Sequence, residues 1–274
     1  MDSLQSAQPE RQTYDGNCHC GAFKFTIMLP TVTTVSACKC RMCFKHACLW
    51  LPLHKRIDLV VVRGEGTLKT FESGHEVKSP ALFCPTCGTT VFGPDAPRHK
   101  GIRLNVWTKA STVHLSAPPF SGSLPALDGM DLKLYYGSCH CGKVQIVLRS
   151  KPLSQVEVKE DDCSICIRVG YTLVYPSLAA VCVQGAENMT GYRFGRKMLE
   201  HKFCSTCGVN MYIAVLGPPK EIVDTFSEAR KEMVRKKLDC ICVNIRALDL
   251  DEDEWDSLKI KRERDESDPV YEVD

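Results

Sequence analysis

Residues 16–21 read Gly-Asn-Cys-His-Cys-Gly, and residues 83–88 read Phe-Cys-Pro-Thr-Cys-Gly. Both stretches recur, as Gly-Ser-Cys-His-Cys-Gly at 137–142 and as Phe-Cys-Ser-Thr-Cys-Gly at 203–208, with offsets of 121 and 120 positions. Self-similarity at a fixed spacing is typical of a repeated structural unit. We therefore interpret the chain as two copies of one module.

The repeat suggests a domain layout for the 274 residues, a length that also favours about two domains. We predict a first zinc domain at 14–115, a linker rich in Pro, Gly and Ser at 116–131, and a second zinc domain at 132–248. A flexible N-terminus would occupy 1–13. An acidic tail would occupy 249–274, solvated and partly disordered, with a regulatory contact to the basic body as the alternative.

Most of each copy has the pattern of β-strands. Apolar and polar residues alternate across 23–28 and 144–148, the period of a half-buried strand. Short apolar runs at 57–62 and 179–183 are followed by Gly and are also typical of strands. Apolar residues at helical spacing across 221–238 predict a short helical insertion in the second copy. The predicted fold class is mainly β: two tandem zinc-binding β domains. Their sheets are small, and cross-links such as bound metal ions would stabilise them.

Each copy contains a Cys-x-Cys pair and, 64 or 63 residues later, a Cys-x-x-Cys-Gly. Four thiolates in two close pairs are the usual ligands of a closed, tetrahedral zinc site. Structural zinc is the favoured interpretation, with an iron–sulfur cluster, disulfides or unligated thiols as alternatives. The predicted ligands are Cys18, Cys20, Cys84 and Cys87 in the first copy, and Cys139, Cys141, Cys204 and Cys207 in the second.

A third motif lies between these pairs, and it differs between the copies. Three protein ligands would leave one zinc position open, as catalytic zinc sites do. The alternatives are a closed site completed by His46 or Cys48, or ordinary buried thiols. The predicted ligands are Cys38, Cys40 and Cys43 in the first copy, and Asp161, with Asp162 as the alternative, Cys163 and Cys166 in the second.

Three histidines lie near these motifs. His19 and His140 each stand between two ligand cysteines and are expected to lie outside the ligand set. His201, just before the second Phe-Cys-x-x-Cys-Gly, is expected to be an ordinary core or surface histidine, with a place in the site as the alternative. The Cys240-Ile241-Cys242 segment has no counterpart in the first copy and is interpreted as a strand.

The combined pattern resembles the glutathione-dependent formaldehyde-activating enzyme and centromere protein V family. That pattern is Gly-x-Cys-His-Cys-Gly, Cys-x-Cys-x-x-Cys, then Phe-Cys-x-x-Cys-Gly. The second copy is similar to the fungal-type members through residues 162–166, 170–176 and 192–195, and residues 243–246 are similar to the family's closing strand. The resemblance covers nearly the whole chain, twice. The second copy departs from the family in having Asp161 for a cysteine, and the first in its 44–48 sequence.

The resemblance implies a fold similar to the Mss4-like zinc folds, a structural zinc on the four paired cysteines, and a second zinc where the family places its chemistry. The implied activity is that of a carbon–sulfur lyase, which joins glutathione and formaldehyde as S-hydroxymethylglutathione. The implied catalytic positions are Cys38, Cys40, Cys43, Cys163 and Cys166.

The chemistry of the residues agrees with this expectation. A thiolate is the nucleophilic form of a thiol, and zinc deprotonates a coordinating thiol. We therefore expect two structural zinc ions, one or two at open sites, and glutathione with a small aldehyde as partners. The alternative function is a non-catalytic zinc-binding module for interaction with other macromolecules.

Charge and hydropathy narrow the function classes further. Residues 249–274 contain 12 acidic and 4 basic residues, a net of −8, so the remainder of a chain of net +2 has +10. Two four-thiolate zincs at −2 and two three-ligand zincs at −1 would lower +10 to +4, which argues against nucleic-acid binding. No apolar run approaches the roughly 18 residues of a membrane span. The polar first dozen residues lack a signal core, so we expect a cytoplasmic protein, with the nucleus as the alternative.

Overall fold

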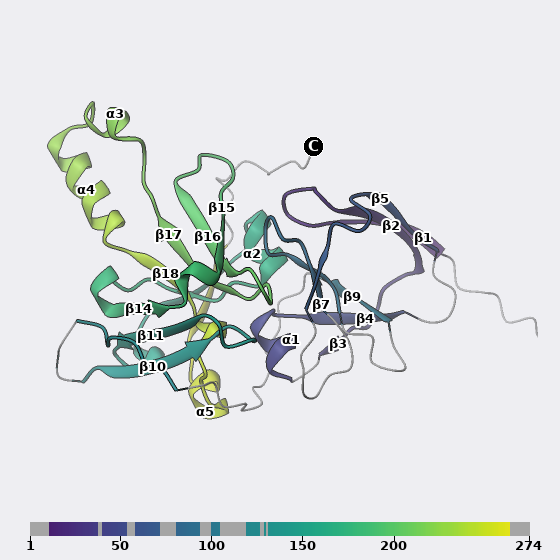
Figure 1. The fold of residues 1–274 in the computed structure, drawn as a ribbon, viewed down its shortest axis with the longest axis horizontal. Coiled ribbons are helices and arrows are strands. Elements are labelled where there is room, and N and C mark those ends of the chain that lie inside the picture. Colours follow the sequence, from purple (N-terminus) through teal and green to yellow (C-terminus); the bar gives the residue numbers. More distant parts are fainter. Residues whose placement is uncertain are drawn as a thin grey trace, which may run out of the picture.

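The computed structural model describes residues 11–37, 40–53, 58–71, 81–93, 100–104, 119–126, 129 and 131–263. The described chain is mainly β, as predicted. Its strands form two modules, each with a three-stranded sheet and a larger one. Figure 1 shows the first module (β1–β9) on the right and the second (β10–β19) on the left, with α1 and α2 between them.

In the first module the sheet orders are β1-β2-β5 and β3-β4-β9-β8-β7-β6. Its elements are β1 (Arg11–Asn17), β2 (Lys24–Pro30), β3 (Ser36–Ala37), α1 (Arg41–Lys45), β4 (Leu49–Leu53), β5 (Asp58–Arg63), β6 (Lys69–Phe71), β7 (Ala81–Phe83), β8 (Thr90–Phe92) and β9 (Lys100–Leu104).

The second module repeats this layout, with orders β10-β11-β14 and β15-β16-β17-β18-β13-β12-β19. Among the described strands, β19 is the one without a counterpart in the first module, and it pairs in parallel with β12. The strands are β10 (Lys133–Ser138), β11 (Gln145–Ser150), β12 (Val158–Asp161), β13 (Leu173–Val174), β14 (Val181–Gln184), β15 (Met189–Tyr192), β16 (Leu199–Cys204), β17 (Asn210–Val215), β18 (Ile241–Asn244) and β19 (Ile260–Glu263). The α-helices are α2 (Ser164–Val169), α3 (Lys220–Val223), α4 (Glu228–Leu238) and α5 (Glu252–Asp256), and the 3-10 helices are Leu153–Gln155, Leu178–Ala180, Ala186–Asn188 and Ile245–Ala247.

The predicted alternation places one face of β2 in the core, with Phe25 and Ile27 buried and Met28 exposed. In β11 both faces are covered. The Gln145 side-chain amide donates to the carbonyl of Pro119, so part of the predicted linker lies against this strand.

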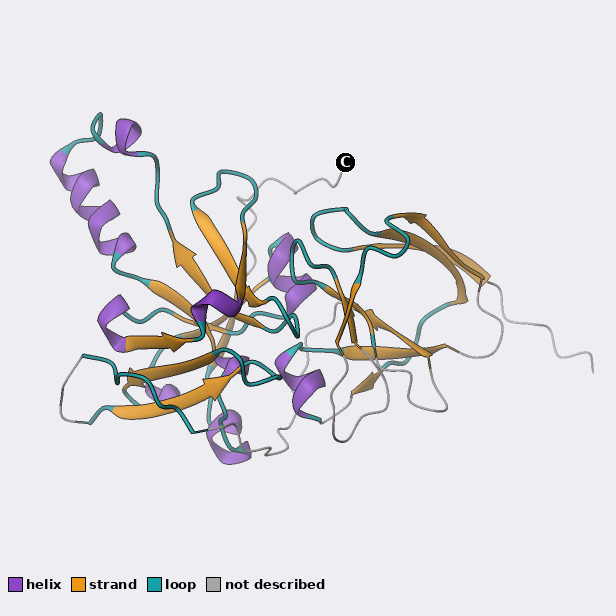
Figure 2. Cartoon of the chain, in the orientation of Figure 1, coloured by secondary structure: helices purple, strands orange, loops and turns teal. Residues whose placement is uncertain are grey.

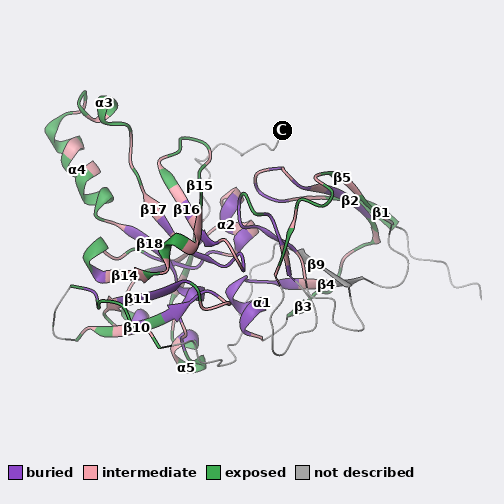
Figure 3. Cartoon of the chain, in the orientation of Figure 1, coloured by how far each residue is buried: buried purple, intermediate pink, exposed green. Residues whose placement is uncertain are grey.

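The predicted helical insertion is present as two helices. The Ser227 side chain accepts a hydrogen bond from the backbone N–H of Arg230 and caps α4, which separates this helix from α3. No residue of α4 is buried, and Figures 1 and 3 show the helix projecting from the body. Figure 2 shows the remaining helices as short elements between strands. Within the described residues, no helix is long and apolar enough to cross a membrane.

The two modules interlock through a reciprocal contact. A Cβ on Gly208 would lie 2.7 Å from the ring of Phe83, and a Cβ on Gly88 would lie 2.8 Å from the ring of Phe203. Both phenylalanines are fully buried, and both glycines have left-handed φ values of +75° and +71°. Each Phe-Cys-x-x-Cys-Gly therefore supplies a ring to the other copy and a glycine that receives the other copy's ring. Burying each ring contributes about 2 kcal/mol.

The start of the acidic C-terminal segment belongs to the fold. Lys45 of α1 is buried, and its Nζ donates to the Ala247 carbonyl at 2.7 Å and to Oδ1 of Asp249 at 2.8 Å. Trp255 on α5 is also buried. The expectation of a solvated, partly disordered tail is therefore wrong for Asp249, Leu250 and Trp255, which pack against the body, whereas most residues of 251–263 are exposed. Asp249 does contact a basic residue of the body, Lys45.

The module contact can be tested with two glycines of similar φ. We expect Gly208→Ala to lower the free energy of unfolding by about 3 kcal/mol, because a methyl group would add overpacking against Phe83 to the strain of a left-handed φ. Gly66 has φ +74° and nothing within 4 Å of its would-be Cβ, so Gly66→Ala should cost only about 1 kcal/mol. Urea unfolding at equal metal content measures both. Equal losses would contradict the proposed role of the contact.

Candidate metal centres

Two groups of four cysteines converge as the sequence predicts. In each group the four sulfur atoms lie within 4.8 Å of one another. The Sγ–Sγ distances are 3.5 Å for Cys18–Cys20, 3.6 Å for Cys20–Cys84, and 3.4 Å for Cys139–Cys141. Four thiolates on a tetrahedral ion at about 2.3 Å would be about 3.8 Å apart. Both groups could thus hold one metal ion with little movement. Their members are Cys18, Cys20, Cys84 and Cys87, and Cys139, Cys141, Cys204 and Cys207.

The protonation of these thiols favours a cation. Hydrogen bonding from Cys18 lowers the pKa of Cys84 to about 7, and hydrogen bonding from Cys139 lowers the pKa of Cys141 to about 7. The pKa of Cys207 is raised, first by burial. A bound cation would stabilise the thiolate form of all four cysteines in each group, because cysteines bind metal ions as thiolates.

A third group of donors forms in the second module. Asp161 ends β12, Cys163 is the N-cap of α2, and Cys166 lies one turn along that helix. One atom from each lies within 4.8 Å of the others, and Oδ1 of Asp161 accepts a hydrogen bond from the backbone N–H of Cys163. Asp161, and not Asp162, joins the group. The two Sγ atoms are 2.7 Å apart, so an ion bound by both would spread them.

The pKa values of Cys163 and Cys166 are shifted in opposite directions. Hydrogen bonding from Cys166 lowers the pKa of Cys163, and the same bond, followed by burial, raises the pKa of Cys166. The strand cysteine Cys242 is buried nearby, which raises its own pKa to about 12. Two sulfurs and one carboxylate oxygen can therefore hold a divalent ion and leave a fourth position for another ligand.

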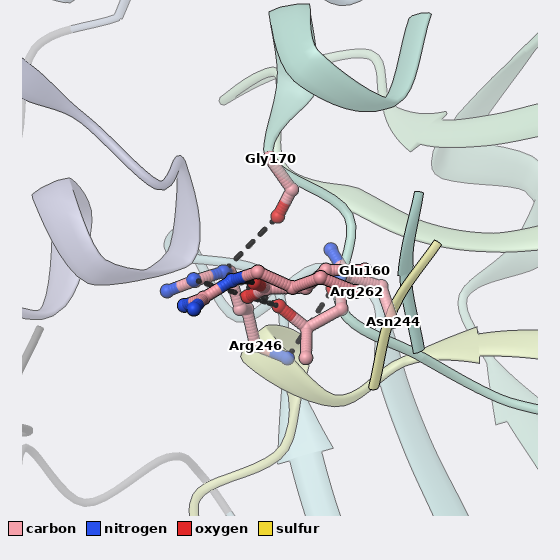
Figure 4. A network of polar contacts seen from close by, with 6 residues as sticks. Glu160, Gly170, Asn244, Arg246 and Arg262 are labelled. Carbon is pink, nitrogen blue, oxygen red and sulfur yellow. Dashed lines mark hydrogen bonds and ion pairs between the residues drawn. The ribbon is translucent and has the colours of Figure 1, made fainter. Parts of the chain in front are cut away.

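A buried polar network fixes the two elements that supply the third group (Figure 4). Glu160, next to Asp161 on β12, accepts hydrogen bonds from Arg246 Nη2 at 3.4 Å and from Arg262 Nε at 3.2 Å. Arg246 Nε also donates to the carbonyl of Gly170, the C-cap of α2, at 3.0 Å. The network therefore ties the strand that ends at Asp161 to the far end of the cysteine-bearing helix.

The equivalent motif of the first module is only partly described, since Cys38 lies outside the described residues. Cys40 is the N-cap of α1 and Cys43 is buried within that helix. The indole N–H of Trp50 donates to Sγ of Cys43 at 3.1 Å. Among the described residues, neither His46 nor Cys48 joins Cys40 and Cys43 in a group of three converging donors.

Side chains from both modules surround the first turn of α2. His19, from the loop between two cysteines of the first module, places Nε2 3.0 Å from Oγ of Ser164 and Nδ1 2.9 Å from the Tyr192 hydroxyl. As expected, His19 is not among the converging metal donors. Ser164 and Tyr192 lie in stretches that carry the family resemblance, but the sequence assigned them no role in a site. The available sequence signal was that Ser164 and Tyr192 differ from Arg41 and Phe71, the residues at the matching positions of the first copy.

His201 lies in the core beside these groups. Its Nδ1 is 3.2 Å from the Tyr171 hydroxyl, and its ring stacks on Phe194 with centroids 5.3 Å apart. Burial lowers the pKa of His19 and of His201 to about 4, so both imidazoles are neutral near pH 7. The prediction of an ordinary core histidine agrees with the burial of His201, while its neighbour Phe194 contacts His19, with ring centroids 4.4 Å apart.

The sequence model of the glutathione-dependent formaldehyde-activating enzyme (GFA) family matches residues 13–118 and again residues 134–246. The chain belongs to the GFA family. The two matches agree with the repeated strand order and with a tandem duplication of one GFA module. The second match ends at Arg246, so α5 and β19 lie beyond it.

One solved structure similar to this GFA chain is the crystal structure of a Rhodobacter sphaeroides protein. It is 25% identical, with a TM-score of 0.33, and the alignment covers 46% of this chain and 99% of that chain.

The two neighbouring aspartates allow a matched test of the third group of this GFA chain. We expect Asp161→Asn to weaken metal binding there by about 10- to 100-fold, because an amide oxygen replaces a charged ligand. Asp162→Asn should leave binding nearly unchanged, because Asp162 is outside the donor group. Native mass spectrometry of the zinc-loaded chain, with a competing chelator, measures both. A greater loss for Asp162→Asn would reverse the assignment.

Proposed function

We propose that this protein is a zinc-dependent carbon–sulfur lyase of the S-(hydroxymethyl)glutathione synthase type, and that the second module contains its active site. The observation that supports the proposal most directly is the convergence of Asp161, Cys163 and Cys166 into a group of three donors, separate from the two four-cysteine clusters. Membership of the GFA family supplies the reaction class. The substrates would be glutathione and formaldehyde or a related small aldehyde.

Zinc is the proposed ion in all three groups. Thiolate-rich, tetrahedral sets of donors select zinc among the common divalent ions. The two closed clusters would stabilise the fold, and the third group would hold zinc with one position free. Zinc bound there would deprotonate a coordinated substrate thiol at neutral pH.

For this reaction the protein mainly has to place the thiol next to the aldehyde. The glutathione sulfur forms a bond to the aldehyde carbon, the carbonyl π bond breaks, and the oxygen takes up the proton that the thiol lost. Asp161, Cys163 and Cys166 would hold the ion that receives the thiol. Holding both reactants together removes most of the entropic cost of their encounter.

Arg168 is the group that we propose binds a carboxylate of glutathione. Arg168 lies on α2, the helix of Cys166, and its Nη1 donates to the carbonyl of Ser164. Its Nε is buried with no hydrogen-bond partner in the described part of the chain. Because Nε is buried, a substrate carboxylate would have to bind the outer N–H groups of this half-buried guanidinium.

The thiol-rich sites favour a reducing compartment, which is the basis for proposing a cytoplasmic location. The alternative function, a non-catalytic zinc-binding interaction module, has one observation in its favour: α4 projects from the body without a buried residue. Acceleration of adduct formation decides between the two functions.

Two cysteines test the proposed reaction. We expect Cys166→Ser to lower the enzyme-catalysed rate by at least about 10-fold, since a neutral hydroxyl replaces a thiolate ligand. Exchange NMR with isotope-labelled formaldehyde and glutathione at equilibrium measures the catalysed rate above the spontaneous one. Cys240→Ser is the control, because Cys240 belongs to none of the three donor groups. Full activity in both Cys163→Ser and Cys166→Ser would exclude this site, and a wild-type chain with three zinc ions but no acceleration would favour the interaction module.

A further inference from the structure

The third donor group lies against the closed cluster of the other module. One apolar core contains Cys18, Cys84 and Cys87 of the first module together with Ile165 and Cys166 of α2. The second module's own cluster belongs to a different core, which α1 enters through Phe44. The candidate active site of the second module is therefore built on the first module's metal cluster.

His19 makes the polar connection between them. Its flanking residues Cys18 and Cys20 are both in the first cluster, and its backbone N–H donates to Oγ1 of Thr89 at 3.3 Å. The cluster thus determines where the imidazole stands. That ring is fully buried and reaches Ser164, the residue directly after Cys163.

Tyr192 fixes the other side of the imidazole. Its hydroxyl is 2.9 Å from Nδ1 of His19, and its strand pairs with β16, where Tyr192 lies opposite His201. His19 therefore bridges the first turn of α2 to the large sheet of the second module.

The mirror position in the repeat lacks this bridge. His140 occupies the place of His19, but the residue equivalent to Tyr192 is Phe71, whose ring His140 contacts edge-on. The residue equivalent to Ser164 is Arg41, whose guanidinium donates to the backbone carbonyl of His140. Nδ1 of His140 has no hydrogen-bond partner within the described chain. Among the described residues, the two copies have thus diverged: His19 contacts the cysteine-bearing helix through Nε2 and strand β15 through Nδ1, whereas Nδ1 of His140 has no hydrogen-bond partner.

We propose that His19 is a positioning residue for the second module's site, and that it couples this site to the first module's closed cluster. With the first cluster loaded, the imidazole holds Ser164 and Tyr192 and orients the first turn of α2, so that Cys163 faces Asp161. Without the ion in the first cluster, the 18–20 loop loses its anchor and the third group loses its binding geometry. The first module then acts as a built-in structural subunit for the second. This inference rests on the proposed function only in requiring a metal ion at the third group.

Cobalt binding tests the coupling without relying on activity. The full chain is first loaded with two equivalents of zinc, and Co²⁺ is then titrated while the thiolate-to-metal charge-transfer absorption is followed. We expect His19→Ala to weaken Co²⁺ binding at the third group by about 10- to 100-fold, as loss of a hydrogen bond that orients a ligand usually does. His19→Gln, whose amide can reach Ser164, should restore part of the affinity. Native mass spectrometry should still show two zinc ions in both variants.

The repeat supplies matched controls. His140→Ala removes the equivalent ring from the other loop and should leave Co²⁺ affinity within about threefold of the wild type, since His140 contacts no residue of α2 by a hydrogen bond that the structure shows. Cys20→Ser, in the first module, should abolish Co²⁺ binding in the second, whereas Cys141→Ser, in the second module's own cluster, should preserve it. Unchanged affinity in His19→Ala, or equal losses in His19→Ala and His140→Ala, overturns the coupling. A wild-type chain that takes up only two ions overturns the third metal site itself, and this inference with it.

Discussion

The reciprocal packing of Phe83 over Gly208 and of Phe203 over Gly88 is the constraint on which the rest of this structure depends. Each ring comes from the residue before a ligand cysteine, and each glycine follows one. A side chain on either glycine would collide with a buried ring, so the modules can approach closely only because these positions lack a Cβ. The contact aligns the two four-cysteine loops back to back, and each loop then lies against the short helix of the other module.

Because of this packing, each module supplies contacts that hold the short helix of the other module. Helices as short as α1 and α2 are not stable without tertiary packing. In separate domains, each would have to find that packing within its own module. In the joined molecule, α1 is secured by the buried Lys45 and its bonds to Ala247 and Asp249 at the end of the second module. The helix α2 is secured by the Arg246 network at its C-cap and by His19 at its first turn. The copies share one topology, yet their helices are held by different chemistry.

The two four-cysteine groups could be predicted from the sequence, because cysteine pairs at spacings of two and three are typical of metal sites. Both four-cysteine groups converge as predicted. The choice between Asp161 and Asp162 could not be made from the sequence, because the two are neighbours and the direction of each side chain depends on where β12 ends, which is at Asp161. The packing of Asp249 and Trp255 could not be predicted for a related reason. Net charge describes solvation on average, whereas one aspartate opposite a buried lysine, and one tryptophan in a core, depend on partners some 200 residues away.

The sequence by itself determined the repeat, the mainly β fold, the family and the ligand types, because each depends on local spacing and on intrinsic residue chemistry. Only the tertiary structure decided that each closed cluster lies against the other module's helix and that His19, and not the equivalent His140, bridges to a candidate active site. The physical reason is that packing between the copies depends on shape at their interface. A repeated motif specifies the same local turn twice but does not specify what that turn will touch.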